Sequence, residues 1–91
     1  MTINVRIPTQ LRSLCDGEPE VTVEANSVGE ALVALNGVNS GFSDRLYDET
    51  GNLRRFVNIF VGEEDIRFLD GLNTELRDGQ TVSIIPAVAG G

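Results

Sequence analysis

The stretch that decides the fold is Glu20–Gly37, EVTVEANSVGEALVALNG, in which the spacing of apolar residues changes once. Its first five residues alternate polar and apolar side chains, the pattern of a strand with one buried face. Ser27 and Glu30 then form a capping box, and apolar residues follow on one helical stripe: Val28, Ala31, Leu32 and Leu35. The pattern predicts a strand followed by a helix over 27–36, with Gly37 as the C′ residue that ends it.

Before this stretch, the sequence predicts a partner for the strand. Ile3, Val5 and Ile7 alternate with polar residues, and Pro8 ends the run. Because Asp16-Gly17 is a turn signal, residues 2–24 are interpreted as a hairpin with a long loop.

After the helix, residues 38–52 are interpreted as a loop with a short helical turn near 43–46. Three further strands are predicted, at Arg55–Val61, Ile66–Phe68 and Thr81–Ile85, with a turn at Gly62–Asp65 and Pro86 as the stop. Strands around one long helix predict an α+β fold, in which a mixed sheet of four to five strands packs on one main helix.

Composition excludes several kinds of chemistry. The 91 residues make one domain, and they include no His, no Lys, no Trp and a single Cys. A Ser-His-Asp or Cys-His centre, a Cys/His zinc site and a lysine Schiff base are therefore excluded. A carboxylate dyad is allowed by composition, but no spacing argues for one, and we expect neither catalytic residues nor a metal site.

The charge balance limits the kinds of partner that the protein can bind. Fourteen acidic residues face seven basic ones, for a net charge of −7, which argues against nucleic acid and anionic membranes. The acidity either steers the protein toward a basic partner surface or only maintains solubility. Because the sequence shows no signal peptide, no apolar run of about 20 residues and no cysteine pair, we expect a cytoplasmic protein.

The C-terminal residues carry most of the functional information. We expect residues 1–86 to form the domain and 87–91 a flexible tail that reaches about 17 Å beyond it. Gly90 lacks a Cβ and suits a narrow channel, while Ala87, Val88 and Ala89 give reach. The carboxylate of Gly91 is a poor electrophile until it is activated, so the tail is interpreted as the substrate of another enzyme. A frayed, inert end is the alternative.

The capping-box helix, FVNIFV at 56–61, DIRF at 65–68, Asp78-Gly79 and VSIIPAVAGG at 82–91 together resemble the ThiS/MoaD family of ubiquitin-fold sulfur carriers. The resemblance covers essentially the whole chain and implies a β-grasp (ubiquitin-like) fold. It implies that an E1-like enzyme uses ATP to adenylate the carboxylate of Gly91, and that sulfide or a persulfide converts the adenylate to a thiocarboxylate. The carrier itself would be no enzyme and would bind no cofactor.

Within the family, the chain is most similar to the branch that serves cysteine biosynthesis. There the sulfur attacks an aminoacrylate held on pyridoxal phosphate (PLP) by a cysteine synthase, and a metalloprotease releases the cysteine. Sulfur donation to molybdopterin, thiazole or a secondary metabolite is the alternative, as is a protein modifier linked to lysines through Gly91. The competing hypothesis, from another class of function, is a β-grasp module that only binds a partner protein and whose tail is inert.

Other residues are weaker candidates. Alternation in the strand at 56–61 puts Val57, Ile59 and Val61 in the core, so Phe56, Phe60 and Phe68 are candidates for a partner-docking patch, unless the 38–52 loop buries these rings. Three further features have functional and purely structural readings. They are Cys15 as a persulfide relay or an incidental thiol, Glu63-Glu64-Asp65 as a cation site or a solvated turn, and Arg54-Arg55 as a grip on a partner carboxylate or a strand entrance. The lack of lysine either spares the activated tail from amines or reflects biased composition.

Overall fold

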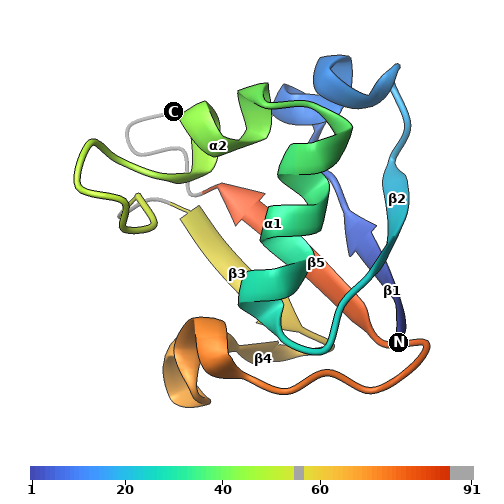
Figure 1. Ribbon diagram of the computed structural model, residues 1–91, viewed down its shortest axis with the longest axis vertical. Coiled ribbons are helices and arrows are strands. Elements are labelled where there is room, and N and C mark those ends of the chain that lie inside the picture. The colour runs from blue at the N-terminus through green and yellow to red at the C-terminus, as the bar shows by residue number, and fades with distance from the viewer. Residues whose placement is uncertain (55–56, 87–91) are drawn as a thin grey trace.

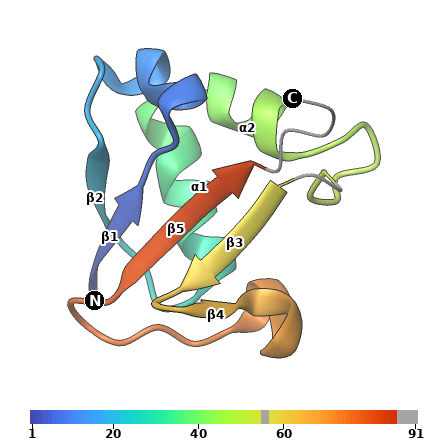
Figure 2. The same cartoon turned by 180° about the vertical axis from the view of Figure 1, so that it is seen from behind.

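A five-stranded mixed sheet with its helices on one side forms the body of the protein, as a computed structural model shows (Figures 1 and 2). The structure describes residues 1–54 and 57–86. The strands are β1 (Thr2–Arg6), β2 (Glu20–Glu24), β3 (Val57–Val61), β4 (Glu64–Asp65) and β5 (Thr81–Pro86). The helices are α1 (Val28–Val38) and α2 (Gly41–Leu46), with short 3-10 helices η1 (Thr9–Cys15), η2 (Ile66–Phe68) and η3 (Gly71–Asn73).

The strand order is β2-β1-β5-β3-β4, so β5 lies in the middle of the sheet. β1 and β2 form the predicted antiparallel hairpin, with Ile3 opposite Val23. β5 runs parallel to β1 and antiparallel to β3. This arrangement is the β-grasp fold, and it confirms the predicted α+β class.

Helix α1 begins where the capping box predicts. The Ser27 Oγ accepts a hydrogen bond from the backbone N–H of Glu30 at 3.2 Å. The Glu30 carboxylate accepts from the N–H of Asn26 at 3.2 Å, one residue earlier than in the standard box. The predicted stripe of Val28, Ala31, Leu32 and Leu35 is buried against the sheet, so α1 packs as its apolar periodicity indicates.

Helix α2 completes the core over the end of the sheet at which β5 ends. Its Phe42 and Leu46 are buried in the same apolar cluster as Ile59 and Ile84. The segment 38–52 therefore contains a full short helix where the sequence predicts only a helical turn, and it covers the inner face of the sheet.

Three local predictions are wrong. Gly37 lies inside α1, which continues to Val38, and Asn39 is the C-cap, its amide oxygen accepting from the N–H of Gly41 at 2.8 Å. Ile66–Phe68 is a 3-10 helix and not a strand, because the Asp65 side chain caps it. The pairing strand is the preceding Glu64–Asp65, within the predicted turn. The hairpin loop holds the unpredicted helix η1.

Candidate functional site

The predicted tail leaves the domain from its central strand. Ala87, Val88, Ala89, Gly90 and Gly91 lie outside the described residues, so the structure defines their point of departure. β5 is hydrogen-bonded to β1 on one side and β3 on the other, and Pro86 pairs with Val57. The segment that carries the predicted reactive carboxylate is therefore attached to the most constrained strand of the sheet (Figure 2).

The face of the sheet away from the helices carries exposed apolar side chains. Ile85 is 47% exposed, and Phe60 on the neighbouring strand is half-buried. Phe60 pairs with Ser83, so Ile85 is its diagonal neighbour, within reach of an aromatic ring. Phe68, on η2, is 82% exposed. We call Phe60, Phe68 and Ile85 the sheet-face patch.

Arg67 ties η2 to this face. Its guanidinium donates to the Asp65 carboxylate, with a closest N–O distance of 2.9 Å, and to the side-chain oxygen of Asn58 on β3. The Asp65 carboxylate also accepts from the backbone N–H of Arg67 at 2.8 Å. The hydrogen bonds from the Arg67 side chain, followed by that backbone bond, lower the pKa of Asp65. This network fixes the residue next to Phe68 against the sheet.

The structure describes two of the three predicted docking phenylalanines, and Phe56 lies outside the described residues. The prediction that Val57, Ile59 and Val61 face the core is confirmed. The 38–52 segment packs on that inner face, so it does not cover Phe60. Sequence reasoning missed Ile85, although the inward alternation of Val82 and Ile84 already assigns it to the open face.

The remaining candidates, where the structure describes them, make contacts within the chain. The thiol of Cys15 is buried and donates to the carbonyl of Glu18 at 3.3 Å, and burial raises its pKa, which disfavours the nucleophilic thiolate. Within residues 1–54 and 57–86, no three His, Cys, Asp or Glu side chains gather into a metal-binding group, and Asp65 of the Glu63-Glu64-Asp65 run is engaged by Arg67. Arg54 donates to the backbone carbonyl of Asp44 at 3.2 Å, and Arg55 lies outside the described residues.

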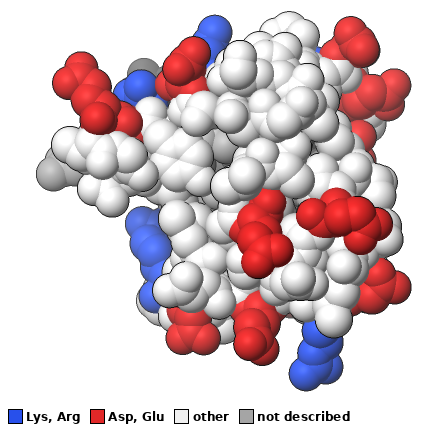
Figure 3. Space-filling view, in the orientation of Figure 1, with Lys and Arg blue, Asp and Glu red and all other residues white. Residues whose placement is uncertain are grey.

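The helix-bearing side of the molecule is predominantly acidic. Figure 3 shows acidic side chains spread over this side, with the basic ones at its margins. None of the helices that the structure describes has both the length and the apolar character to cross a membrane. The side of the sheet that bears the helices is thus acidic (Figure 3), and the opposite side carries the exposed apolar side chains of Phe60 and Ile85.

A β-grasp domain with its last strand at the centre of the sheet is the fold of the ubiquitin-like proteins. Comparison with protein families identifies the family within this class. The chain matches the ThiS family over residues 5–91, and it belongs to that family. Its homologues are named sulfur carrier proteins, which are small carriers rather than enzymes.

Individual relatives agree with this assignment. The chain is 45% identical to the sulfur carrier protein CysO of Mycobacterium tuberculosis over 93 aligned residues, which cover all of both chains. It is 37% identical over 65 residues to small archaeal modifier protein 3 of Haloferax volcanii, covering 71% of this chain and 70% of that one. Among solved structures, a chain of the BexX/CysO complex of Amycolatopsis orientalis matches with a TM-score of 0.89 and 42% identity, over 98% of this chain and 99% of that one.

Proposed function

We propose that the protein carries sulfur as a thiocarboxylate on Gly91 and donates it in cysteine biosynthesis. The observation that carries this proposal is the match to CysO, in which both chains align over their full lengths. The family match likewise extends to Gly91. These matches support the proposal that the Gly-Gly pair of this chain carries the reactive carboxyl group.

The proposed loading reaction has two steps. A carboxylate oxygen of Gly91 attacks the α-phosphate of ATP in an E1-like enzyme, which forms an acyl-adenylate and releases pyrophosphate. Sulfide attacks the acyl carbon, AMP leaves, and the thiocarboxylate forms directly. Where an enzyme persulfide attacks instead, AMP leaves and an acyl disulfide forms, and a second thiol cleaves its S–S bond, which frees the thiocarboxylate and leaves a disulfide between the two thiols. The carrier contributes no acid, base or metal, and its role is to present the carboxyl group.

The proposed acceptor is an aminoacrylate held on PLP by a cysteine synthase. The thiocarboxylate sulfur attacks the β-carbon of the aminoacrylate and forms a new C–S bond. A shift of the acyl group from sulfur to the amine leaves cysteine bound to Gly91 by an amide, which a metalloprotease hydrolyses. The name of the M. tuberculosis relative supports this branch.

The sheet-face patch is the proposed docking surface for these enzymes. Phe60 and Ile85 lie on the open face, Phe68 is exposed on η2 beside Arg67, and Ile85 is only one residue from Pro86, where the described part of β5 ends. An enzyme that takes the tail into its active site therefore meets this face as well. A few side chains near the centre of an interface carry most of its binding energy, and aromatic rings are frequent among them.

The similarity to small archaeal modifier protein 3 favours a second candidate function. In that case the activated carboxyl of Gly91 would be attacked by a lysine amine of a target protein, and an isopeptide bond would form. The activation step is shared, and only the nucleophile differs.

Intact-mass spectrometry tests the proposal. The full chain is incubated with ATP, sulfide and a candidate E1-like enzyme, and we expect a mass gain equal to the replacement of one oxygen by sulfur. A matched chain that lacks Gly90 and Gly91 is expected to remain unchanged. Adding a PLP enzyme charged with aminoacrylate should then yield a cysteine adduct, whereas a modifier would give conjugates to protein lysines. A chain that no such enzyme charges, but that still binds its partner without the two glycines, would be an interaction module.

A further inference from the structure

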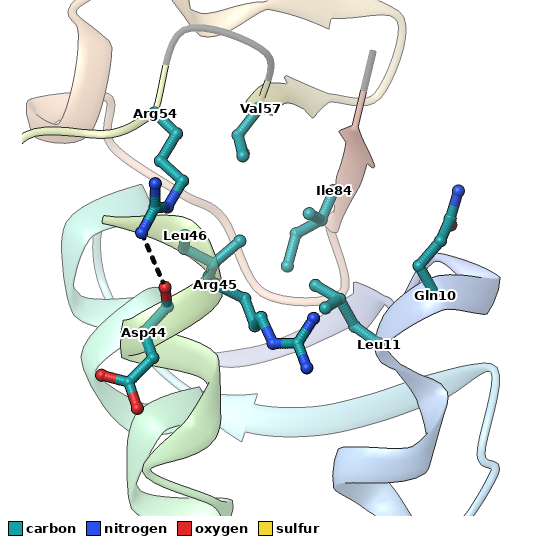
Figure 4. A pocket seen from close by; sticks show the side chains of 8 residues that line it. All are labelled: Gln10, Leu11, Asp44, Arg45, Leu46, Arg54, Val57 and Ile84. Atoms are coloured by element: carbon teal, nitrogen blue, oxygen red, sulfur yellow. Dashed lines mark hydrogen bonds between the residues drawn. The ribbon is translucent and has the colours of Figure 1, made fainter. Parts of the chain in front are cut away.

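A small apolar cavity lies at the end of the sheet where the tail departs. Its volume is about 290 Å³, and Leu11, Leu46, Val57 and Ile84 line its inside (Figure 4). These four residues come from η1, α2, β3 and β5. Sites for drug-sized ligands start at about 300 Å³, so this cavity has room for a few small residues at a time.

Two arginines stand at the rim of the cavity. Figure 4 shows the guanidinium of Arg45 directed toward Leu11 and Gln10, and that of Arg54 bonded to the Asp44 backbone carbonyl. The carboxylate of Asp44 points away from both. The ion pairs found within the described residues involve neither Arg45 nor Arg54, although carboxylates outnumber arginines two to one in the sequence. A guanidinium without a carboxylate matches an incoming carboxylate in charge and hydrogen-bonding geometry.

We propose that this cavity reversibly binds the chain's own C-terminal segment, with the Gly91 carboxyl group at the arginine rim. Ile84 in the cavity wall is two residues before Pro86, and the five residues that follow have a reach of about 17 Å. Ala87, Val88 and Ala89 are apolar, as the inside of the cavity is, and the glycine before the last residue lets the Gly91 carboxyl group turn toward the arginine rim.

Docking within one chain requires only a weak contact, because a short linker gives an effective concentration in the millimolar range. This inference rests on the proposed function in one respect, since the docked group is the one that would carry sulfur. Docking withdraws the thiocarboxylate from solvent between partners, and a partner's tail channel competes with the cavity for the same residues. The cavity thus holds the thiocarboxylate while the carrier is not bound to a partner.

Nuclear magnetic resonance tests the docking with the full chain, without ATP, sulfide or any enzyme. The first comparison is with the chain that lacks Gly90 and Gly91. We expect this deletion to shift the methyl signals of Leu11 and Ile84 and the Nε–H signals of Arg45 and Arg54. The methyl signals of Val33, on the exposed side of α1, serve as the internal control and should stay in place.

The second comparison uses the titration of a ¹³C-labelled Gly91 carboxyl group. Pairing with arginine favours the charged form, so we expect its pKa to lie below the ordinary range of about 3.3–3.7 for a terminal carboxyl. Arg45→Gln should bring it back toward that range. Arg77→Gln is the matched control, because Arg77 is exposed and precedes the opposite end of β5; it should leave the titration unchanged.

Identical cavity signals with and without the two glycines would overturn the proposal, as would a Gly91 titration that Arg45→Gln does not alter. Signals that respond only when an E1-like enzyme is added would assign the cavity to that partner and would also overturn it. Because no sulfur chemistry enters this experiment, failure of docking leaves the mass-spectrometric test of the carrier function intact, and the reverse holds too.

Discussion

Replacing Phe68 with alanine should weaken partner binding while leaving the fold unchanged. The side chain is 82% exposed in the free protein, so little of its burial contributes to folding. Full burial of such a ring contributes about 1.5–3 kcal/mol. If a partner buries the exposed 82%, about 1.2–2.5 kcal/mol is available, which corresponds to a roughly 8- to 60-fold increase in Kd.

The assay is the KM for the carrier in ATP–pyrophosphate exchange by the activating enzyme, with a direct titration of the two proteins for Kd. Val33→Ala is the matched control, since Val33 is 71% exposed and lies on α1, in the helical layer. Urea unfolding of both variants should agree with the unchanged chain within about 0.5 kcal/mol. Equal effects of the two substitutions, or no effect of Phe68→Ala on either constant, would refute the assignment of the sheet-face patch as the docking surface.

Three further predictions concern single side chains. Ser27→Ala removes the cap that receives the N–H of Glu30 and should lower the free energy of unfolding by about 1 kcal/mol, seen as a decrease of about 4–8 °C in Tm. Because the folded-state pKa of Asp65 is lowered, its carboxylate stabilises the fold above the ordinary aspartate pKa of about 3.9. The difference in unfolding free energy between the unchanged chain and Asp65→Asn should therefore shrink as the pH falls below that value. A difference that grows in acid would contradict this role of Asp65. The buried Cys15 thiol, whose pKa is raised, should react with a disulfide reagent many times more slowly in the folded chain than in urea, and Cys15→Ala should load sulfur at an unchanged rate if the thiol is no relay.

The parts of the fold that the sequence predicts well are those with strong local patterns. The stripe that begins at Val28 and the alternation of Ile3, Val5 and Ile7 each depend on residues a few positions apart. Burial on one face follows directly from such spacing. The resemblance to a known family predicts the β-grasp fold, which periodicity alone does not determine, and the strand order itself comes only from the structure.

The misplaced elements depend on side chains that compete with the backbone. Asp65 accepts the N–H of Arg67, which turns a segment of strand-like composition into a 3-10 helix. Asn39 is the C-cap of α1, and its backbone N–H donates to the carbonyl of Leu35. The sequence predicts the end two residues earlier, at Gly37, because glycine is the usual C′ residue. The cavity was not predicted at all, because Leu11, Leu46, Val57 and Ile84 are far apart in sequence and meet only in the folded chain.

The arrangement of nucleophiles explains how an activated carboxyl group at Gly91 would survive on this chain until sulfur arrives. Any amine or thiolate within reach would attack an acyl-adenylate, and the sequence contains no lysine and no histidine. The amino group of Met1 pairs with Glu24 beside the start of β1. Since β1 and β5 are parallel and Asn4 pairs with Thr81, that amine lies beyond the opposite end of β5 from Pro86. At about 3.3 Å per strand residue it is about 26 Å away, whereas the tail reaches about 17 Å. Cys15 is buried as a thiol, so sulfide delivered by the partner meets no competitor on the carrier.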